Sequence, residues 1–297
     1  MERRYFFIIV IIILSSGFFF QAIGQNLETS LERYTGKNAG GYIQPLVTAF
    51  GANLNSGIYR NAHVPRKGLH IHFSLNAMMS IFSDEQRTFL ASTEGLFQPP
   101  QQVETPTVVG DGEGAQVIGT GGTIFQFPGG YDLESFITAS PMISISGMAG
   151  LELSARYFAT KINEDIGNLS LYGFGLRHNI NQYIPLFPVD MAAGIFYNNF
   201  KVGDIIEAKA FIIHAEVSKS FLLFDLYTGI GYESSKANIN YTFDAFGQTQ
   251  EISLDVRGEN KFRTTVGLGF NLLIFHINAD YNIGYQKLFN VGVSIGL

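Results

Sequence analysis

The chain has 297 residues, a formal net charge of -6 and no cysteine. A mildly acidic chain lacks the clustered Lys and Arg needed to neutralise phosphates, which excludes a nucleic-acid partner, and no disulfide framework can support the fold. Charged residues make up 15% of the sequence, against about 25% in typical soluble domains. Together with 33 glycines and 27 phenylalanines, this low share indicates a surface that faces lipid.

Residues 1–24 are predicted to be a cleaved export signal. Arg3 and Arg4 form a basic start, and an almost unbroken apolar run follows from Tyr5 to Phe20. Small residues precede the expected cut after Gly24. The run is short for a transmembrane helix, which needs about 20 apolar residues, and no cysteine follows it that could carry a lipid anchor. We therefore expect export to the cell outer membrane.

Residues 25–67 show a helical period instead of a strand period. The apolar side chains recur every three or four residues, as on one face of a helix, with Pro45 expected in its first turn; they are Ile43, Leu46, Val47 and Phe50. The segment is either a periplasmic cap or a plug (hatch) in a barrel lumen. The plug is favoured, because an apolar helix face in the periplasm would need a cover.

The plug interpretation makes a direct prediction. Deleting residues 25–65 is expected to raise the conductance of the protein in planar bilayers, because the lumen would lose its filling. An unchanged conductance would count heavily against a plug.

From residue 68 to residue 297 the dominant period is two. In Leu69–Ile81, for example, one face is apolar and the other is mostly polar, as expected of a strand. Such segments are 68–82, 86–93, 140–147, 149–160, 168–178, 187–200, 205–218, 221–243, 250–271, 275–284 and 288–297. Bacterial barrels have even strand numbers, so a further strand is expected near Ala115–Phe127, which gives about 12, with 10 or 14 as alternatives.

Two all-β architectures produce this alternation, a soluble sandwich and a transmembrane antiparallel β-barrel. The polar faces contain mostly Gly, Asn and Ser, and many segments reach the roughly 10 residues that cross hydrocarbon when tilted. Aromatic residues lie near segment ends, as in an interfacial girdle; they are Tyr157, Tyr197, Tyr232, Tyr281 and Tyr285. The absence of Trp argues against a membrane barrel, but the pattern favours it, with outer-membrane lipid as its partner.

The last residues alternate up to the end of the sequence. Asn290, Gly292, Ile295 and Leu297 resemble the assembly signal of outer-membrane barrels, although the last residue is more often Phe in such proteins. We therefore expect the barrel-assembly machinery to recognise the strand Asn290–Leu297.

The polar faces would place eight charged side chains in the lumen: Glu152, Arg156, Arg177, Asp190, Glu216, Asp225, Arg263 and Asp280. Ion pairs that fill the barrel are favoured over a selectivity or ligand site. No catalytic residue, metal or cofactor is expected. GxSxG is absent, and the proximity of Ser154 and Ser170 to His178 in the sequence is no more than chance would give.

Three tracts carry a resemblance to a known family: Tyr42–Val47 with Gly51 and Asn55–Gly57, Ile143–Gly147 through Arg156–Tyr157, and Asn179–Pro185. On these residues the chain resembles an uncharacterised family of Bacteroidota outer-membrane β-barrel proteins, a domain of unknown function, from Gly41 to Leu297. The N-terminal helix is also similar in architecture to the hatch of long-chain fatty-acid transport porins. The resemblance implies a barrel and supplies no mechanism.

The leading functional hypothesis is passive transport or uptake of a small hydrophobic molecule through a plugged, porin-like pore. The second is a structural or docking barrel without transport, and the third is an outer-membrane hydrolase.

Overall fold

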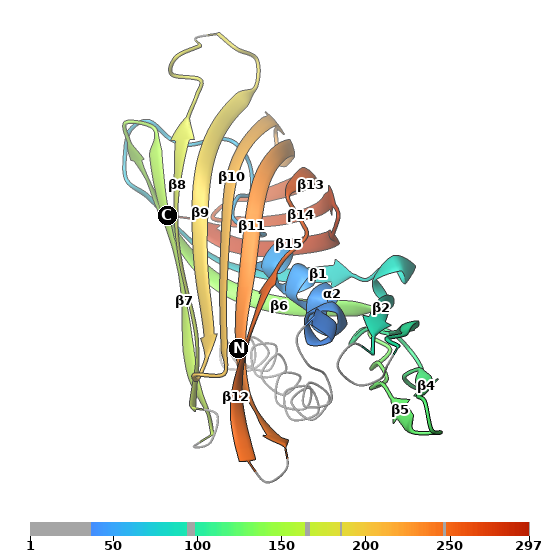
Figure 1. The fold of residues 1–297 in the computed structure, drawn as a ribbon. Coiled ribbons are helices and arrows are strands. Elements are labelled where there is room, and N and C mark those ends of the chain that lie inside the picture. Colours follow the sequence, from blue (N-terminus) through green and yellow to red (C-terminus); the bar gives the residue numbers. More distant parts are fainter. Residues whose placement is uncertain (1–36, 94–98, 164–166, 185, 246–247, 297) are drawn as a thin grey trace, which may run out of the picture.

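The computed structural model describes residues 37–93, 99–163, 167–184, 186–245 and 248–296. The predicted export signal lies outside them. Ten strands close into an antiparallel barrel (Figure 1). They are β1 (His70–Ile81), β6 (Ser135–Met148), β7 (Leu151–Asn163), β8 (Gly167–Asn179), β9 (Asp190–Val202), β10 (Ile206–Phe221), β11 (Phe224–Ala245), β13 (Phe262–Leu272), β14 (Phe275–Gly284) and β15 (Lys287–Gly296).

The ring closes because β15 pairs with β1, from Ile81↔Lys287 to His72↔Gly296. This pairing leaves no unpaired strand edge between β1 and β15, because an open sheet edge is not tolerated in lipid. The prediction of a closed antiparallel barrel with one N-terminal helix, α2 (Lys37–Leu54), is therefore confirmed. Recognition of β15 by the assembly machinery stays a prediction, and Leu297 lies outside the described residues.

The predicted count of 12 strands is wrong, because the ring contains ten. The segments 86–93 and 115–127 form short hairpins outside the barrel: β2 (Thr88–Ser92) with β3 (Gln102–Pro106), and β4 (Gln116–Ile118) with β5 (Ile124–Gln126). Strands of three to five residues cannot cross hydrocarbon. A 3-10 turn, η1 (Asp84–Gln86), precedes them.

The predicted strand 250–271 is two strands. β12 (Gln248–Arg257) pairs with the distal part of β11, from Lys236↔Arg257 outward, whereas β13 pairs with its proximal part, up to Tyr232↔Phe262. Residues 258–261 separate the two strands, and the Gly258 N–H still donates to the Ser235 carbonyl of β11 at 3.0 Å. β12 therefore stands outside the closed ring.

Helix α2 begins earlier than the sequence predicts. It starts at Lys37, so Pro45 lies inside the helix and not in its first turn. A proline there removes one backbone donor from the helical ladder.

The two ends of the barrel differ. At the first, called the turn end, β1 begins, β15 ends, and β6–β7, β8–β9, β10–β11 and β13–β14 connect. At the opposite end, called the loop end, β7 to β12 extend well beyond the shorter wall of β13, β14, β15 and β1, towards the bottom of Figure 1. Helix α2 and the β2–β5 hairpins occupy the open side of this taller half.

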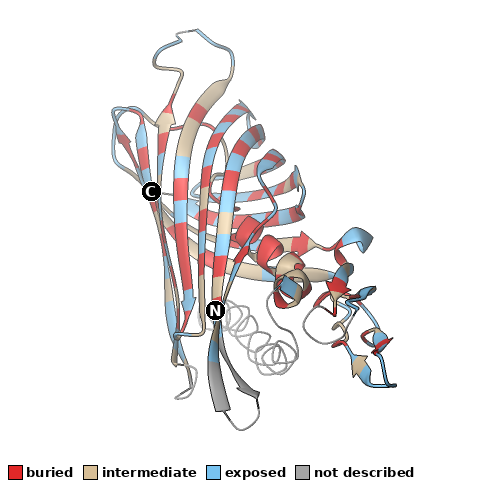
Figure 2. Cartoon of the chain, in the orientation of Figure 1, coloured by how far each residue is buried: buried red, intermediate tan, exposed pale blue. Residues whose placement is uncertain are grey.

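Exposed and buried residues alternate along the strands of the wall (Figure 2). In the middle of the wall the exposed side chains are apolar and the buried ones are mostly polar. The outward side chains are large and exposed, for example Phe73, Leu153, Phe174, Ile230 and Leu268. Towards the loop end this belt finishes in outward aromatic rings that neighbour one another across strands, Tyr157 with Tyr172, Phe174 with Tyr197, and Tyr232 with Phe262. An apolar band with an aromatic border is the surface of a barrel that lies in lipid.

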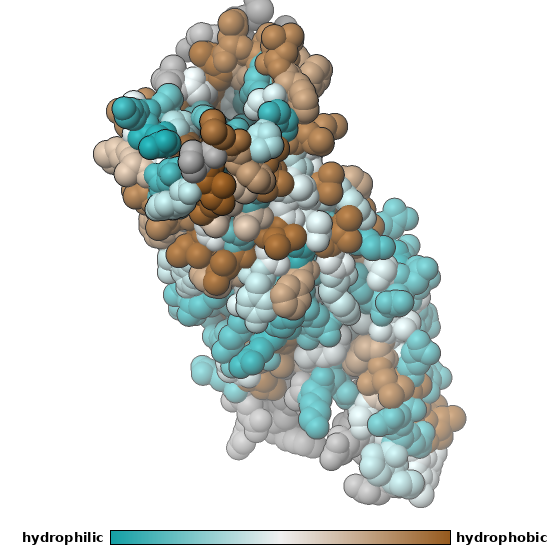
Figure 3. Space-filling model, turned by 90° about the horizontal axis from the view of Figure 1, so that it is seen from above, coloured by the Kyte–Doolittle hydropathy of each residue, from teal (hydrophilic) through white to brown (hydrophobic). Residues whose placement is uncertain are grey.

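The turn tips extend this apolar belt. Phe224 to Tyr232 spans about 26 Å along the strand, and a tilt of about 40° leaves roughly 20 Å of depth, slightly less than the usual band of about 25 Å. Leu222 and Leu273 at the turn tips are 99% exposed and have positive φ. Figure 3 shows apolar side chains gathered at this end beside hydrophilic ones. Lipid contact at the tips would complete the band.

Candidate functional site

A charged network fills the lumen near the turn end. Arg177 of β8 lies between two buried carboxylates: its Nη2 is 2.7 Å from the Glu152 Oε1, and its Nη1 donates to the Glu216 Oε1 at 2.8 Å. Arg60 approaches the other Glu152 oxygen at 3.7 Å, and the His214 Nδ1 lies 2.5 Å from the Glu216 Oε2. The two guanidinium groups of Arg60 and Arg177 balance the two carboxylates, so the network is a compensated filling.

The segment after α2 runs through this lumen. The Asn61 Nδ2 donates to the Asp225 Oδ2 at 3.0 Å, and the Ala62 backbone N–H donates to the Ser218 hydroxyl at 2.9 Å. The Tyr59 ring stacks on the His214 ring, with centroids 5.2 Å apart. Residues 55–64 therefore contact the inward faces of several strands on their way to the start of β1.

The C-terminal end of α2 meets two arginines of the wall. The Arg156 guanidinium donates to the carbonyl oxygens of Leu54 and Gly57, both at 2.8 Å, and to that of Ser56. Arg156 is 1% exposed and forms no ion pair within the described residues. The free carbonyls at a helix C-terminus carry partial negative charge, so they compensate this buried cation.

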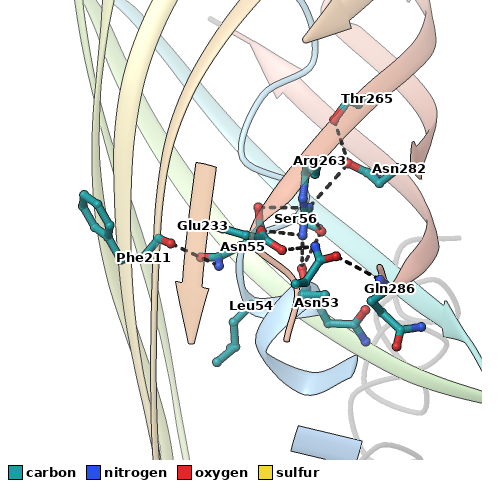
Figure 4. A network of polar contacts seen from close by, with 12 residues as sticks. Asn53, Leu54, Asn55, Ser56, Phe211, Glu233, Arg263, Thr265, Asn282 and Gln286 are labelled. Atoms are coloured by element: carbon teal, nitrogen blue, oxygen red, sulfur yellow. Dashed lines mark hydrogen bonds and ion pairs between the residues drawn. The ribbon is translucent and has the colours of Figure 1, made fainter. Parts of the chain in front are cut away.

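Arg263 of β13 holds the same helix end from the opposite wall (Figure 4). Its Nη2 donates to the Ala52 carbonyl at 2.8 Å and lies 2.7 Å from the Glu233 Oε2. Its Nη1 donates to the Ser56 hydroxyl. The helix end is thus anchored by a charged pair on one side and by an unpaired arginine on the other.

The remaining predicted luminal residues are also placed. Asp280 accepts hydrogen bonds from the Tyr227 hydroxyl and the Asn290 amide, at 2.9 and 2.8 Å. Asp225 also accepts one from Asn271 at 2.9 Å. Asp190, by contrast, is one-third exposed beside His63, so it lies near the opening of the lumen and not in its core.

The sequence did not single out Arg60 or Glu233. Glu233 has the inward parity of β11, so the alternation could have identified it. Arg60 belongs to a segment without a period, and nothing in the sequence pointed to its partner.

Beyond the aromatic border the polarity of the wall reverses. The inward side chains of the taller half become apolar and form what we call the cradle: Leu169, Leu171, Phe200, Val202, Ala208, Ala210, Ala237, Ile239 and Val256. On β8, for example, Leu169 and Leu171 share the inward parity of Gly173 and Arg177. The cradle is therefore an apolar concave surface outside the lipid belt.

The outer face of the same half is polar. Lys236 pairs with Asp255 at 3.1 Å, and Lys209 pairs with Glu207 at 3.2 Å. Hydrogen bonds from Asn238 and Lys236 hold the pKa of the Asp255 carboxyl below its usual value. Such exposed pairs belong in water, so the taller half projects from the membrane.

Helix α2 packs into the cradle. Of the predicted plug residues, Ile43 and Val47 are buried in the same apolar cluster as the cradle, and Leu46 and Phe50 pack against it half-buried. The Phe50 ring contacts the Phe200 ring edge-on, with centroids 4.7 Å apart. Helix α2 and residues 55–64, which follow it, thus lie between the cradle and the charged network of the lumen.

The described residues offer little else chemically. None of the helices among them is both long and apolar enough to span a bilayer. No three of their His, Asp or Glu side chains are arranged to hold a metal. The Ser154 hydroxyl is hydrogen-bonded to the Ser144 hydroxyl at 2.9 Å, and the His178 Nε2 to the Tyr183 hydroxyl at 2.9 Å.

A family model described as a family of unknown function (DUF6588) matches residues 1–297. The chain belongs to this family. No curated protein matches it significantly.

Several solved outer-membrane proteins show distant similarity. The N-terminal β-barrel domain of Pseudomonas aeruginosa OprF is 15% identical, covering 50% of this chain and 94% of its own, with a TM-score of 0.25. Ail of Yersinia pestis is 12% identical, covering 78% and 99%, at 0.26. The transport unit of the autotransporter AIDA-I from Escherichia coli is 8% identical, covering 85% and 98%, at 0.32. The contacts of this chain, and not these similarities, support the barrel described above.

Proposed function

We propose that the chain is an outer-membrane barrel that takes up a small apolar molecule from outside the cell. The apolar belt supports a position in a membrane. Outer-membrane barrels have short periplasmic turns and longer extracellular loops, so the turn end faces the periplasm and the loop end faces outward. The cradle then lies on the external side.

The reversal of polarity across the aromatic border carries this proposal. A wall that only had to be stable in water could be polar on its inner face near the opening. Here that face is apolar on every strand from β8 to β12. Helix α2 covers the cradle in this structure, so its apolar area becomes available to a solute when the helix moves. Apolar contact area then favours transfer of an apolar solute by about 25 cal/mol per Å².

The lumen of the barrel is filled and not an open pore. Residues 55–64 and the network around Arg177 occupy the path between the cradle and the turn end. Passage therefore requires that α2 and the following segment move, as in a gated barrel.

Binding to the cradle is tested by titrating dansyl-labelled undecanoic acid into the protein in lipid nanodiscs, with empty nanodiscs as background. Phe200→Ser, an inward change, is expected to weaken binding about tenfold, because burial of one aromatic side chain is worth about 1.5–3 kcal/mol. Lys201→Ser, the outward neighbour on β9, is the matched control and should bind like the parent. Equal affinity of both variants would contradict the proposal.

A further inference from the structure

The connections at the turn end carry apolar side chains that no other described residue covers. The β10–β11 turn lies within Phe221–Phe224 and the β13–β14 turn within Leu272–Phe275, and every side chain in both runs is apolar and exposed. Leu186 of the β8–β9 connection is fully exposed, and Met148 beside the β6–β7 turn is 68% exposed. All four connections therefore present apolar side chains at one end of the barrel.

The backbone at three of these tips would suit other residues better. Leu186, Leu222 and Leu273 have φ values of 68°, 48° and 54°. A two-residue hairpin turn with positive φ at its first central residue ordinarily has glycine there, because the left-handed region is unfavourable for a bulky side chain. The β6–β7 turn does contain such a glycine, Gly150, at φ 70°. Leucine in the strained position at three tips indicates that the apolar side chain itself is needed.

The exposed charges at this end are positive. Arg66 and Lys67 are exposed shortly before β1, and Arg66 lies beside Gly150 of the β6–β7 turn. Lys219 is exposed near the end of β10, and its Nζ donates to the Pro188 carbonyl, so its ammonium lies level with the β8–β9 connection. We call these three cations, which surround the turn end, the basic rim.

No acidic side chain of the connections compensates the basic rim. The described residues of the four connections contain neither Asp nor Glu. Asp190, at the start of β9, has its Oδ1 3.2 Å from the His63 Nδ1 and so already has a partner. The turn end therefore combines uncovered apolar tips with positive charges that are free to meet an anion.

This combination matches the edge of a bilayer that contains anionic lipid. Apolar side chains transfer favourably into hydrocarbon, and Lys and Arg near the surface attract anionic headgroups. The apolar wall covers roughly 20 Å of depth and the usual band is about 25 Å, so hydrocarbon reaches the tips. A soluble partner protein would have to displace lipid to reach them, which favours lipid as the occupant.

We propose that the turn end is a binding site for anionic phospholipids of the periplasmic leaflet. The leucine tips lie among the acyl chains, and the basic rim binds the phosphate groups. The two contacts together fix the depth of the barrel, so the tips end within the membrane and not in the periplasm. The site lies at the opposite end from the cradle and does not depend on binding there.

Lipid preference is measured by native mass spectrometry of the protein released from nanodiscs of phosphatidylethanolamine and phosphatidylglycerol in equal amounts. The parent is expected to retain phosphatidylglycerol in preference to phosphatidylethanolamine. The triple variant Arg66→Gln, Lys67→Gln, Lys219→Gln should lose this preference, by about fivefold for each cation removed.

The matched control is the triple variant Lys201→Gln, Lys209→Gln, Lys236→Gln, which removes three exposed cations from the outer face of the taller half. Each of these lysines already pairs with a carboxylate, that of Glu207 or Asp255. The control should therefore keep the preference of the parent. An unchanged preference without the basic rim, or an equal loss in both triple variants, would overturn the site.

The depth of the tips is measured with a spin label in liposomes of the same two lipids. The chain has no cysteine, so Leu222→Cys takes a single label. Its collisions with oxygen, relative to those with a water-soluble nickel chelate, should resemble those of a label at Ile230 in the apolar belt. A ratio like that of a label at Ser253, exposed on β12, would place the tip in water and refute the proposal. Neither readout involves dansyl-acid binding, so a failure of the lipid site and a failure of the cradle are distinguishable.

Discussion

Replacing Arg177 by methionine is expected to prevent the barrel from reaching a stable folded form. Without Arg177, the buried Glu152 and Glu216 carboxylates both lose an ion-pair partner. Arg60 is then the only guanidinium left in the network. Removing one partner of a buried ion pair typically costs about 3–5 kcal/mol. The fraction of barrel that resists unfolding on an unheated SDS gel, and its midpoint in urea, measure the effect.

A second substitution distinguishes charge balance from lost packing. Arg177→Met with Glu216→Gln leaves one cation, Arg60, beside one anion, Glu152, so stability should largely return. Arg177→Met with Glu152→Gln leaves Arg60 without its near partner and should recover less. If the two double variants behaved alike, or if Arg177→Met alone were as stable as the parent, the network would not be a balanced charge cluster.

Alternation along the strands was sufficient to predict the wall but not the number of strands. Each long segment from β7 to β11 has period two, and a strand's faces follow from that period alone. The segments 86–93 and 115–127 alternate as well, but membrane pairing needs length that β2 and β4 do not have. The division of 250–271 into β12 and β13 depends on pairing with two different parts of β11, which a one-dimensional pattern does not contain.

The same limit applies to the site. Parity was enough to place Glu152, Arg177 and Glu216 inside the barrel, and Glu152 and Arg177 lie opposite each other on adjacent strands. It could not show that Arg177 reaches across β9 to Glu216 of β10. It could not show that Arg156 would donate to carbonyls of a helix about a hundred residues earlier in the chain. The reversal at the cradle was present in the sequence, since Leu169 and Leu171 share the parity of Gly173, but it is meaningful only once the membrane border is located.

Replacing Arg156 by methionine is expected to open the barrel to ions. Arg156 donates to three carbonyl oxygens at the end of α2, and a buried carbonyl left unpaired costs about 1–3 kcal/mol. Because Arg156 has no carboxylate partner among the described residues, its loss leaves no buried anion behind. The lost hydrogen bonds attach residues 54–57 to the wall and do not pair its strands, so the barrel should still assemble. Single-channel recordings in planar bilayers should show a raised and fluctuating conductance.

Two comparisons decide whether that conductance reports release of the plug. Arg257→Met, at an exposed position of β12, removes an equal charge but keeps the backbone carbonyl that accepts from the Gln44 Nε2 of α2, so it should conduct like the parent. Arg263→Met removes the other anchor but leaves Glu233 unpaired, so it should lower the urea midpoint, which Arg156→Met should change much less. If Arg156→Met conducted like the parent while remaining folded, the contacts of residues 55–64 with the wall would suffice to hold the plug, and the helix end would not be its anchor.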